Sequence, residues 1–158
     1  MNPMMKSMRS LLIALGISLS ISGLAQPKKV TLVDHSALTG IPLPTGSKAD
    51  KRLLSVSSAN MLLEGVGGKQ GMELGTAEVL SLPPAPTDGN TIGLLNTLVG
   101  NSGWVAQPIA GEPSCFWLTK AQRQILAFYE PGKKETSLYL AEAKPKTITA
   151  TTAVSGSK

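Results

Sequence analysis

Very few residues of this chain have the types and spacing that catalysis needs. His35 is the only histidine, so a histidine metal cluster is excluded, and a serine, histidine and aspartate triad would have to use this one residue. We interpret it as a solvated histidine in a linker. Carboxylates that could pair for glycoside cleavage fall near the ends of expected strands, where solvated charges are usual: Glu112, Glu130, Glu135 and Glu142. Because no acid, base and nucleophile occur together, we expect a protein that is not an enzyme.

Two further features could carry chemistry, a single thiol and a run of glycines. Cys115 is the only cysteine, so no intrachain disulfide can form. A free thiol packs as a small hydrophobe, which favours a half-buried strand residue over a reactive site. The GVGGKQG stretch at 65–71 has neither GxGxxG nor Walker spacing and predicts a plain loop. We therefore expect no cofactor and no metal.

All aromatic residues lie within residues 103–143, where bulky and β-branched side chains recur at strand spacing. Four strands are expected there, at 104–107, 115–119, 124–130 and 136–142. The loops between them are short and contain Pro, Gly or charged residues, which indicates an antiparallel meander. One face of this meander is a continuous apolar layer that should form the core: Phe116, Leu118, Ile125, Ala127, Tyr129, Leu138 and Leu140.

The opposite face of the meander mixes aromatic and charged residues: Cys115, Trp117, Thr119, Gln124, Leu126, Phe128, Glu130, Glu135, Ser137 and Tyr139. Exposed aromatic patches mark interaction sites, so Trp117, Phe128 and Tyr139 are the predicted partner-binding residues. The alternative is that strands from residues 53–82 fold back over this face as a second layer. A different function, binding of a small apolar ligand, would need a pocket between helix and sheet lined by Leu95, Val99, Phe116 and Leu138.

The elements that must support the meander precede it in the chain. Short strands are expected at 53–57 and 61–66, and a longer one at 72–82 that Pro83 and Pro84 stop. Residues 91–99 predict a helix with one apolar face, with Asp88 as a possible cap and Gly100 at its exit. The fold class is therefore α+β, an antiparallel sheet made of the C-terminal four-strand meander and N-terminal strands, with one helix packed on one face.

The two ends of the chain frame this domain, which we place at 41–143. Residues 1–25 have the three parts of a secretory signal, because Lys6 and Arg9 precede an apolar run and small residues surround Ala25. The run is too short and too rich in serine for a spanning helix, so no integral membrane segment is expected after cleavage. Residues 26–40 are predicted as a linker with a possible edge strand at 30–33, and 144–158 as a disordered tail.

Charge narrows the class of partner. The formal net charge is +5, but the basic residues are scattered along the chain without the stripe that a phosphate backbone requires, so we expect no nucleic acid partner. The prediction is an exported noncatalytic protein, periplasmic or secreted, that binds an envelope protein or a surface polymer through a sheet face.

Overall fold

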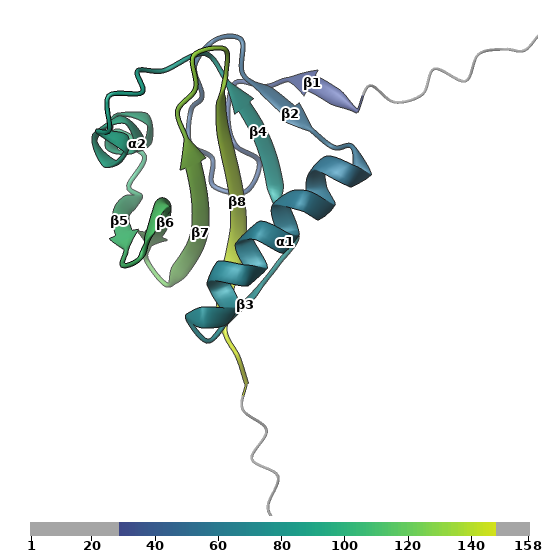
Figure 1. Cartoon of the computed structure of the whole chain (residues 1–158), viewed down its shortest axis with the longest axis vertical. Helices are drawn as coiled ribbons and strands as arrows, with labels where there is room; N and C mark the ends of the chain where they lie inside the picture. The colour runs from purple at the N-terminus through teal and green to yellow at the C-terminus, as the bar shows by residue number, and fades with distance from the viewer. Residues whose placement is uncertain (1–28, 148–158) are drawn as a thin grey trace, which may run out of the picture.

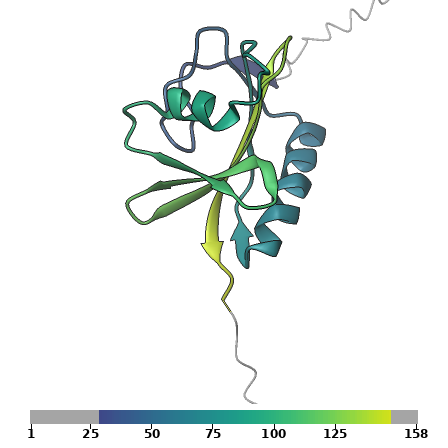
Figure 2. The ribbon, with the colours of Figure 1, turned by 60° about the vertical axis from the view of Figure 1, so that its left-hand side comes forward.

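A computed structural model describes residues 29–147 and has the expected α+β fold, an antiparallel sheet with helices on its faces. The expectations for a signal at 1–25 and for the tail beyond residue 147 lie outside the described residues. Two helices are present, α1 (Leu53–Lys69) and α2 (Thr91–Val99), where one was expected. They pack on opposite faces of the sheet, as Figure 2 shows.

The sheet has eight strands in the described part of the chain, hydrogen-bonded in the order β1-β2-β4-β8-β7-β6-β5, with β3 also paired to β8. Their bounds in chain order are β1 (Val30–Leu32), β2 (Lys48–Asp50), β3 (Met72–Leu74), β4 (Glu78–Leu82), β5 (Val105–Ile109), β6 (Glu112–Lys120), β7 (Arg123–Glu130) and β8 (Thr136–Pro145). Figure 1 shows β8 near the middle of the sheet, with α1 crossing it diagonally.

The C-terminal meander of β5 to β8 has the predicted register. Phe116 pairs with Ala127, and Tyr129 with Leu138, so the whole predicted apolar layer faces one side. That layer is buried in a first core cluster together with Leu95 and Val99 of α2. The predicted cover of this face by the helix at 91–99 is confirmed.

The caps of α2 differ in detail from the prediction. The side-chain oxygen of Asn90, rather than Asp88, accepts a hydrogen bond from the Gly93 amide at 3.2 Å. Gly100 takes the positive φ that ends the helix, and its amide donates to the Asn96 carbonyl. A β-carbon at Gly93 would lie 2.5 Å from the Asn90 side chain, so glycine at this position leaves room for the cap.

The strands predicted at 53–57 and 61–66 are wrong, and so is the loop at 65–71, because α1 covers all but the last two of these residues. Val56, Ala59, Leu63 and Val66 recur at the spacing of one helix face and pack on the sheet. Apart from Glu64 and Lys69, the outward positions carry leucine, serine, methionine and glycine in place of charges, so the sequence lacks the continuous charged stripe that marks an amphipathic helix. Packing against a second core cluster stabilises α1 despite its glycines.

The strand predicted at 72–82 is two strands, β3 and β4, that follow each other along β8. Leu74 pairs with Ala143 and Glu78 with Leu140, so the register shifts by one residue between them. Asn60 of α1 accepts a hydrogen bond from the Ala77 amide at 2.7 Å, which satisfies a donor that the irregularity leaves out of the ladder. The helix is thereby attached to the sheet at its middle.

Both predicted domain boundaries shift outward. Residues 30–32 form the expected edge strand, but residues 33–40 belong to the domain rather than to a linker, because Ser36 is fully buried and the indole Nε1 of Trp104 donates to the Thr39 carbonyl at 2.9 Å. At the other end β8 continues to Pro145, which pairs with Met72. Lys144 and Pro145 are therefore strand residues and not part of a tail.

Candidate functional site

The predicted partner-binding residues lie on the face of the sheet that α1 partly covers. Trp117, Phe128 and Tyr139 are each half-buried and pack against the second core cluster, which includes Leu63 and Val66 of α1. The rings of Phe128 and Tyr139 stack, with centroids 5.2 Å apart and planes 21° from parallel. The alternative prediction is met only in part: residues 53–69 cover this face, but as the helix α1 rather than as strands, and residues 72–82 join the sheet itself as β3 and β4.

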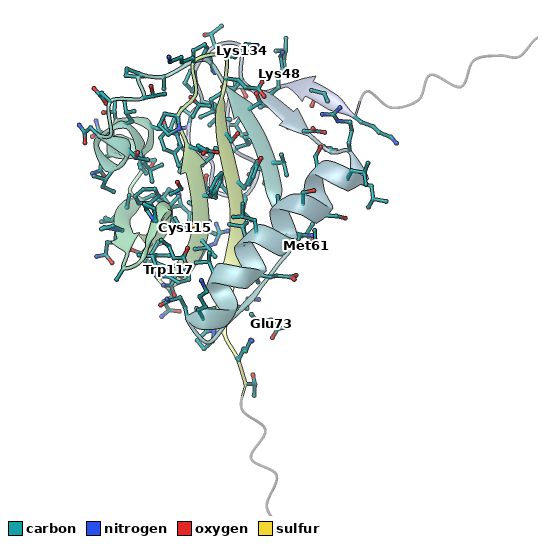
Figure 3. The ribbon with its side chains drawn as sticks, in the orientation of Figure 1. Lys48, Met61, Glu73, Cys115, Trp117 and Lys134 are labelled. Atoms are coloured by element: carbon teal, nitrogen blue, oxygen red, sulfur yellow. The ribbon has the colours of Figure 1, made fainter. Side chains whose placement is uncertain are left out.

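Beside these aromatic residues is a groove, which we call the α1–β6 groove. It has a volume of about 400 Å³, is open to solvent, and is lined by Leu62, Gly65, Val66 and Lys69 of α1, by Glu112–Cys115 of β6, and by Phe128. Figure 3 shows Cys115 and Trp117 on the side of the sheet next to the lower, C-terminal end of α1. Of the three predicted residues, Phe128 reaches the groove, while Tyr139 supports it from behind through the ring stack.

The rim of the α1–β6 groove is electrically balanced. Lys69 Nζ lies 2.7 Å from Glu112 Oε1, and this contact joins the end of α1 to the start of β6. The hydrogen bond to Glu112 raises the pKa of Lys69, so the lysine stays charged at neutral pH. The groove therefore presents an apolar floor under a neutral ion pair, which favours an uncharged group as its occupant.

Cys115 lies at the base of the α1–β6 groove but is not chemically poised. Its side chain is buried, and burial followed by the nearby Glu112 raises the pKa of the thiol to about 11. A thiolate is the nucleophilic form, so this cysteine is unreactive at neutral pH. The prediction of a half-buried strand residue understated its burial, since Cys115 belongs to the second core cluster.

A larger cleft of about 850 Å³, the N-terminal cleft, lies between β1, β2, the start of β4 and the 33–46 loop. The carboxylates that line it have local partners. The carboxylate of Glu78 accepts hydrogen bonds from Ser36 Oγ at 2.6 Å and from the amides of Ala37 and Leu38 at 2.7 Å and 3.2 Å. Because Ser36 is buried and donates to Glu78, its hydroxyl is not available as a nucleophile.

Two other acidic residues of the N-terminal cleft also have local partners. Asp50 accepts hydrogen bonds from Arg52 and Ser55, and the Arg52 contact holds the pKa of that carboxyl well below its usual range. Asp34 contacts the ring of His35, its neighbour in sequence, and both side chains are solvent-exposed. What remains open in the cleft is its apolar wall, formed by residues such as Leu32, Val56 and Val79.

The residues expected to line a ligand pocket are packed in the core. Leu95, Val99, Phe116 and Leu138 are all buried in the first core cluster, so the space between α2 and the sheet is filled by their side chains. A cleft of about 450 Å³ lies at the outer edge of α2, but it is lined by Leu94, Leu98 and surrounding prolines. The predicted location of a ligand pocket is therefore wrong.

Within residues 29–147 there is no group of three or more His, Cys, Asp or Glu side chains that could hold a metal ion. The same part of the chain has no helix long and apolar enough to span a membrane.

Sequence reasoning missed a set of exposed apolar side chains. Leu53, Leu54 and Met61 of α1 are 77%, 81% and 70% exposed, and Leu32 of β1 is 75% exposed. Figure 3 shows Met61 on the outer side of α1, away from the sheet. The sequence did contain an indication of these exposed side chains, because no charged residue occurs between Leu53 and Leu63. If this segment is a helix, its outer face must be uncharged.

Comparison of this chain with protein-family models, with curated proteins and with solved structures finds no match.

Proposed function

We propose that this protein is an exported, noncatalytic binding domain that binds a protein or surface-polymer partner on the α1 side of its sheet. The observation that carries this proposal is the α1–β6 groove, where Phe128 is only half-buried at the base of an apolar surface that opens to solvent. An isolated domain gains stability by closing such a surface, so its openness favours a partner that supplies the missing apolar contact.

The shape of the α1–β6 groove favours a side chain presented by a macromolecule over a free small ligand. Sites for small molecules enclose most of the ligand surface, whereas this groove is shallow and bounded on two sides, by α1 and by the start of β6. The proposed occupant is an uncharged or apolar group of the partner that covers Phe128. Trp117, on the same sheet face, extends the contact surface beyond the groove, and Tyr139 holds the Phe128 ring in place.

The noncatalytic part of the proposal rests on the state of the polar groups. The Cys115 thiol is protonated at neutral pH, and the carboxylates of Glu78 and Asp50 are engaged by neighbouring donors. General acid–base catalysis needs a group within reach of a substrate proton, and these groups are occupied in holding loops and helix ends.

A pair of glycine substitutions on α1 tests the groove. Gly65 lines the groove and Gly68 does not, and a β-carbon at either position meets no atom within 4 Å. Gly65→Phe should fill the groove, whereas Gly68→Phe adds the same ring on the same helix outside it. Neither change should weaken the fold, because glycine has a lower helix propensity than the phenylalanine that replaces it.

The measurement is capture of partners from the envelope fraction of the producing cell by immobilised protein, with captured proteins identified by mass spectrometry and cell-wall polymer quantified by sedimentation. The proposal requires a partner that wild type and Gly68→Phe retain equally and that Gly65→Phe loses. Equal capture by all three proteins would show that the groove is not the binding site.

Export is tested separately, by mass spectrometry of the protein recovered outside the cytoplasm. The signal pattern of residues 1–25 predicts a mature chain that begins at Gln26. Recovery of a chain that still carries Met1, or recovery only from cytoplasm, would contradict export without bearing on the groove.

A second candidate function, binding of a small apolar ligand, is favoured by one observation. The N-terminal cleft has about 850 Å³ of space and an apolar wall that includes Val56 of α1 and Val79 of β4, so it lies partly between helix and sheet. Thr31 also lines the cleft, and Thr31→Trp should occlude it. Fluorescence of an anilinonaphthalene dye that is strong with wild type and with Gly65→Phe but weak with Thr31→Trp would support this function; unchanged fluorescence would exclude the cleft.

A further inference from the structure

The β1–β2 hairpin brings together basic residues that are far apart in the sequence. Leu32 lies opposite Lys48, and the Lys51 amide donates to the Lys29 carbonyl at 2.6 Å. α1 starts three residues after β2 ends, so Leu53 and Leu54 follow closely in the chain on Asp50, the residue that pairs with Val30. Figure 1 shows β1, β2 and the start of α1 meeting at one corner of the molecule.

We call this region the basic–apolar corner and define it by Val30, Leu32, Leu53, Leu54, Lys29, Lys48 and Lys51. Its three leucines are among the most exposed large apolar side chains of the described residues. Single exposed leucines are ordinary, but several at one corner of a soluble domain indicate a surface that is covered in use.

The lysines of the corner are exposed and lie outside the ion pairs of the described residues. Arg52 is engaged by Asp50, at 2.6 Å between Nη2 and Oδ2. None of the ion pairs within residues 29–147 involves Lys29, Lys48 or Lys51, and all three are exposed. The corner therefore combines exposed leucines with three exposed lysines that take no part in these ion pairs.

We propose that the basic–apolar corner docks this protein on an anionic membrane surface. Leucine side chains insert at the boundary between headgroups and acyl chains, while lysines bind headgroup phosphates. The centre of a protein–protein interface is instead enriched in aromatic residues and depleted of lysine, and this corner has several lysines and no aromatic residue. The composition thus favours a lipid surface over a protein partner.

The position of the corner in the chain supports the same occupant. The apolar run that predicts a signal ends close to Ala25, and Lys29 follows only four residues later. Four residues span at most about 14 Å when extended, so on the proposed export route Lys29 stays within about 14 Å of the signal until cleavage after Ala25. Docking there needs no further contact from the rest of the domain and leaves the α1–β6 groove accessible.

The test is co-sedimentation of the protein with vesicles. The chain from Gln26 to Lys158 is suitable, because both core clusters consist of residues within 29–147. One set of vesicles is equimolar phosphatidylglycerol and phosphatidylcholine, and the other is phosphatidylcholine alone. We expect binding to the anionic vesicles that weakens with added salt and little binding to the neutral ones.

Variants locate the binding surface. Lys48→Gln with Lys51→Gln should weaken binding by about 25-fold, since each lysine near an anionic surface contributes about fivefold. The matched control is Lys144→Gln with Lys146→Gln, which removes the same charge at the far end of β8. Leu53→Ser with Leu54→Ser should also weaken binding, whereas Val105→Ser, an exposed apolar change at the β5 edge, should not.

These outcomes decide the proposal. The proposal would be overturned if the protein did not sediment with anionic vesicles, or if the two double lysine variants lost vesicle binding equally. The first result would instead favour a protein partner at the corner. Melting curves of each variant check the fold, and the changed side chains are all exposed. Gly65→Phe should bind vesicles like wild type, so failure of this proposal and failure of the proposed groove are distinguishable.

Discussion

The same substitution, glycine to alanine, should raise the stability of the protein at two positions of α1 and lower it at a third. Gly65 and Gly68 face solvent, and a β-carbon at either would meet no atom within 4 Å. Gly67 is buried, and its β-carbon would lie 3.0 Å from both Cγ and Cδ1 of Leu74 on β3. The environment of each position therefore decides the sign.

The magnitudes follow from two opposing effects. Replacing a helical glycine by alanine stabilises by about 0.5–1 kcal/mol, because alanine loses less backbone entropy on folding. Gly65→Ala and Gly68→Ala should each show this gain. At Gly67 the same gain is opposed by crowding against Leu74, and overpacking a core costs about 1–3 kcal/mol. Gly67→Ala should therefore destabilise the protein by up to about 2 kcal/mol.

Chemical denaturation followed by circular dichroism measures all three variants against wild type, with equal m-values as the check on two-state behaviour. For a domain of this size a change of 1 kcal/mol moves the melting temperature by about 4 °C, which is easily resolved. A rise in stability for all three variants would refute close packing of α1 on β3. A fall for all three would refute the helix itself, since a loop at 65–71 gives no gain from alanine.

Three further predictions concern buried and paired side chains. Cys115→Ser should lower the free energy of unfolding by about 1–3 kcal/mol, because it places a hydroxyl in the second core cluster. The stability of wild type should fall as pH rises from 9.0 through about 11, because burial raises the pKa of the thiol in the folded state. Glu78→Ala should cost about 2–4 kcal/mol, since three donors of the 36–38 segment lose their acceptor. Wild type should be more stable than Asp50→Asn at neutral pH, and this difference should shrink as pH falls below 3.8, because the pKa of Asp50 is depressed in the folded state.

Each of these predictions has a control. Cys115→Ala keeps the site apolar and should cost less than Cys115→Ser, and the reverse order would contradict burial among apolar groups. Glu130→Ala removes an exposed carboxylate and should change stability by less than about 0.5 kcal/mol. A constant difference between Asp50→Asn and wild type down to the acid transition would show that the Arg52 pair has no role in stability.

Local pattern was sufficient for the C-terminal half of the protein. From Cys115 to Leu140 alternation of side chains determines which face is buried, and short loops force neighbouring strands to pair antiparallel, so the register and the apolar layer could be predicted. The helix at 91–99 could be placed because its apolar face is continuous. The residue that caps it could not, since Asp88 and Asn90 are equally suited by type and only the path of the chain selects Asn90.

Local pattern was insufficient for residues 53–69. Leucines, serines and glycines there have no strong preference for strand or helix, and α1 forms because Ala59, Leu63 and Val66 bury apolar surface against the sheet. That contact also decides the candidate site, since it half-buries Trp117, Phe128 and Tyr139 and creates the groove beside them. Composition and strand spacing thus determined an α+β sheet with one well-defined core face. The sequence did not determine which segment covers the other face, or which lysines and leucines gather at one corner. Both depend on contacts between residues far apart in sequence, and only the tertiary structure decides those contacts.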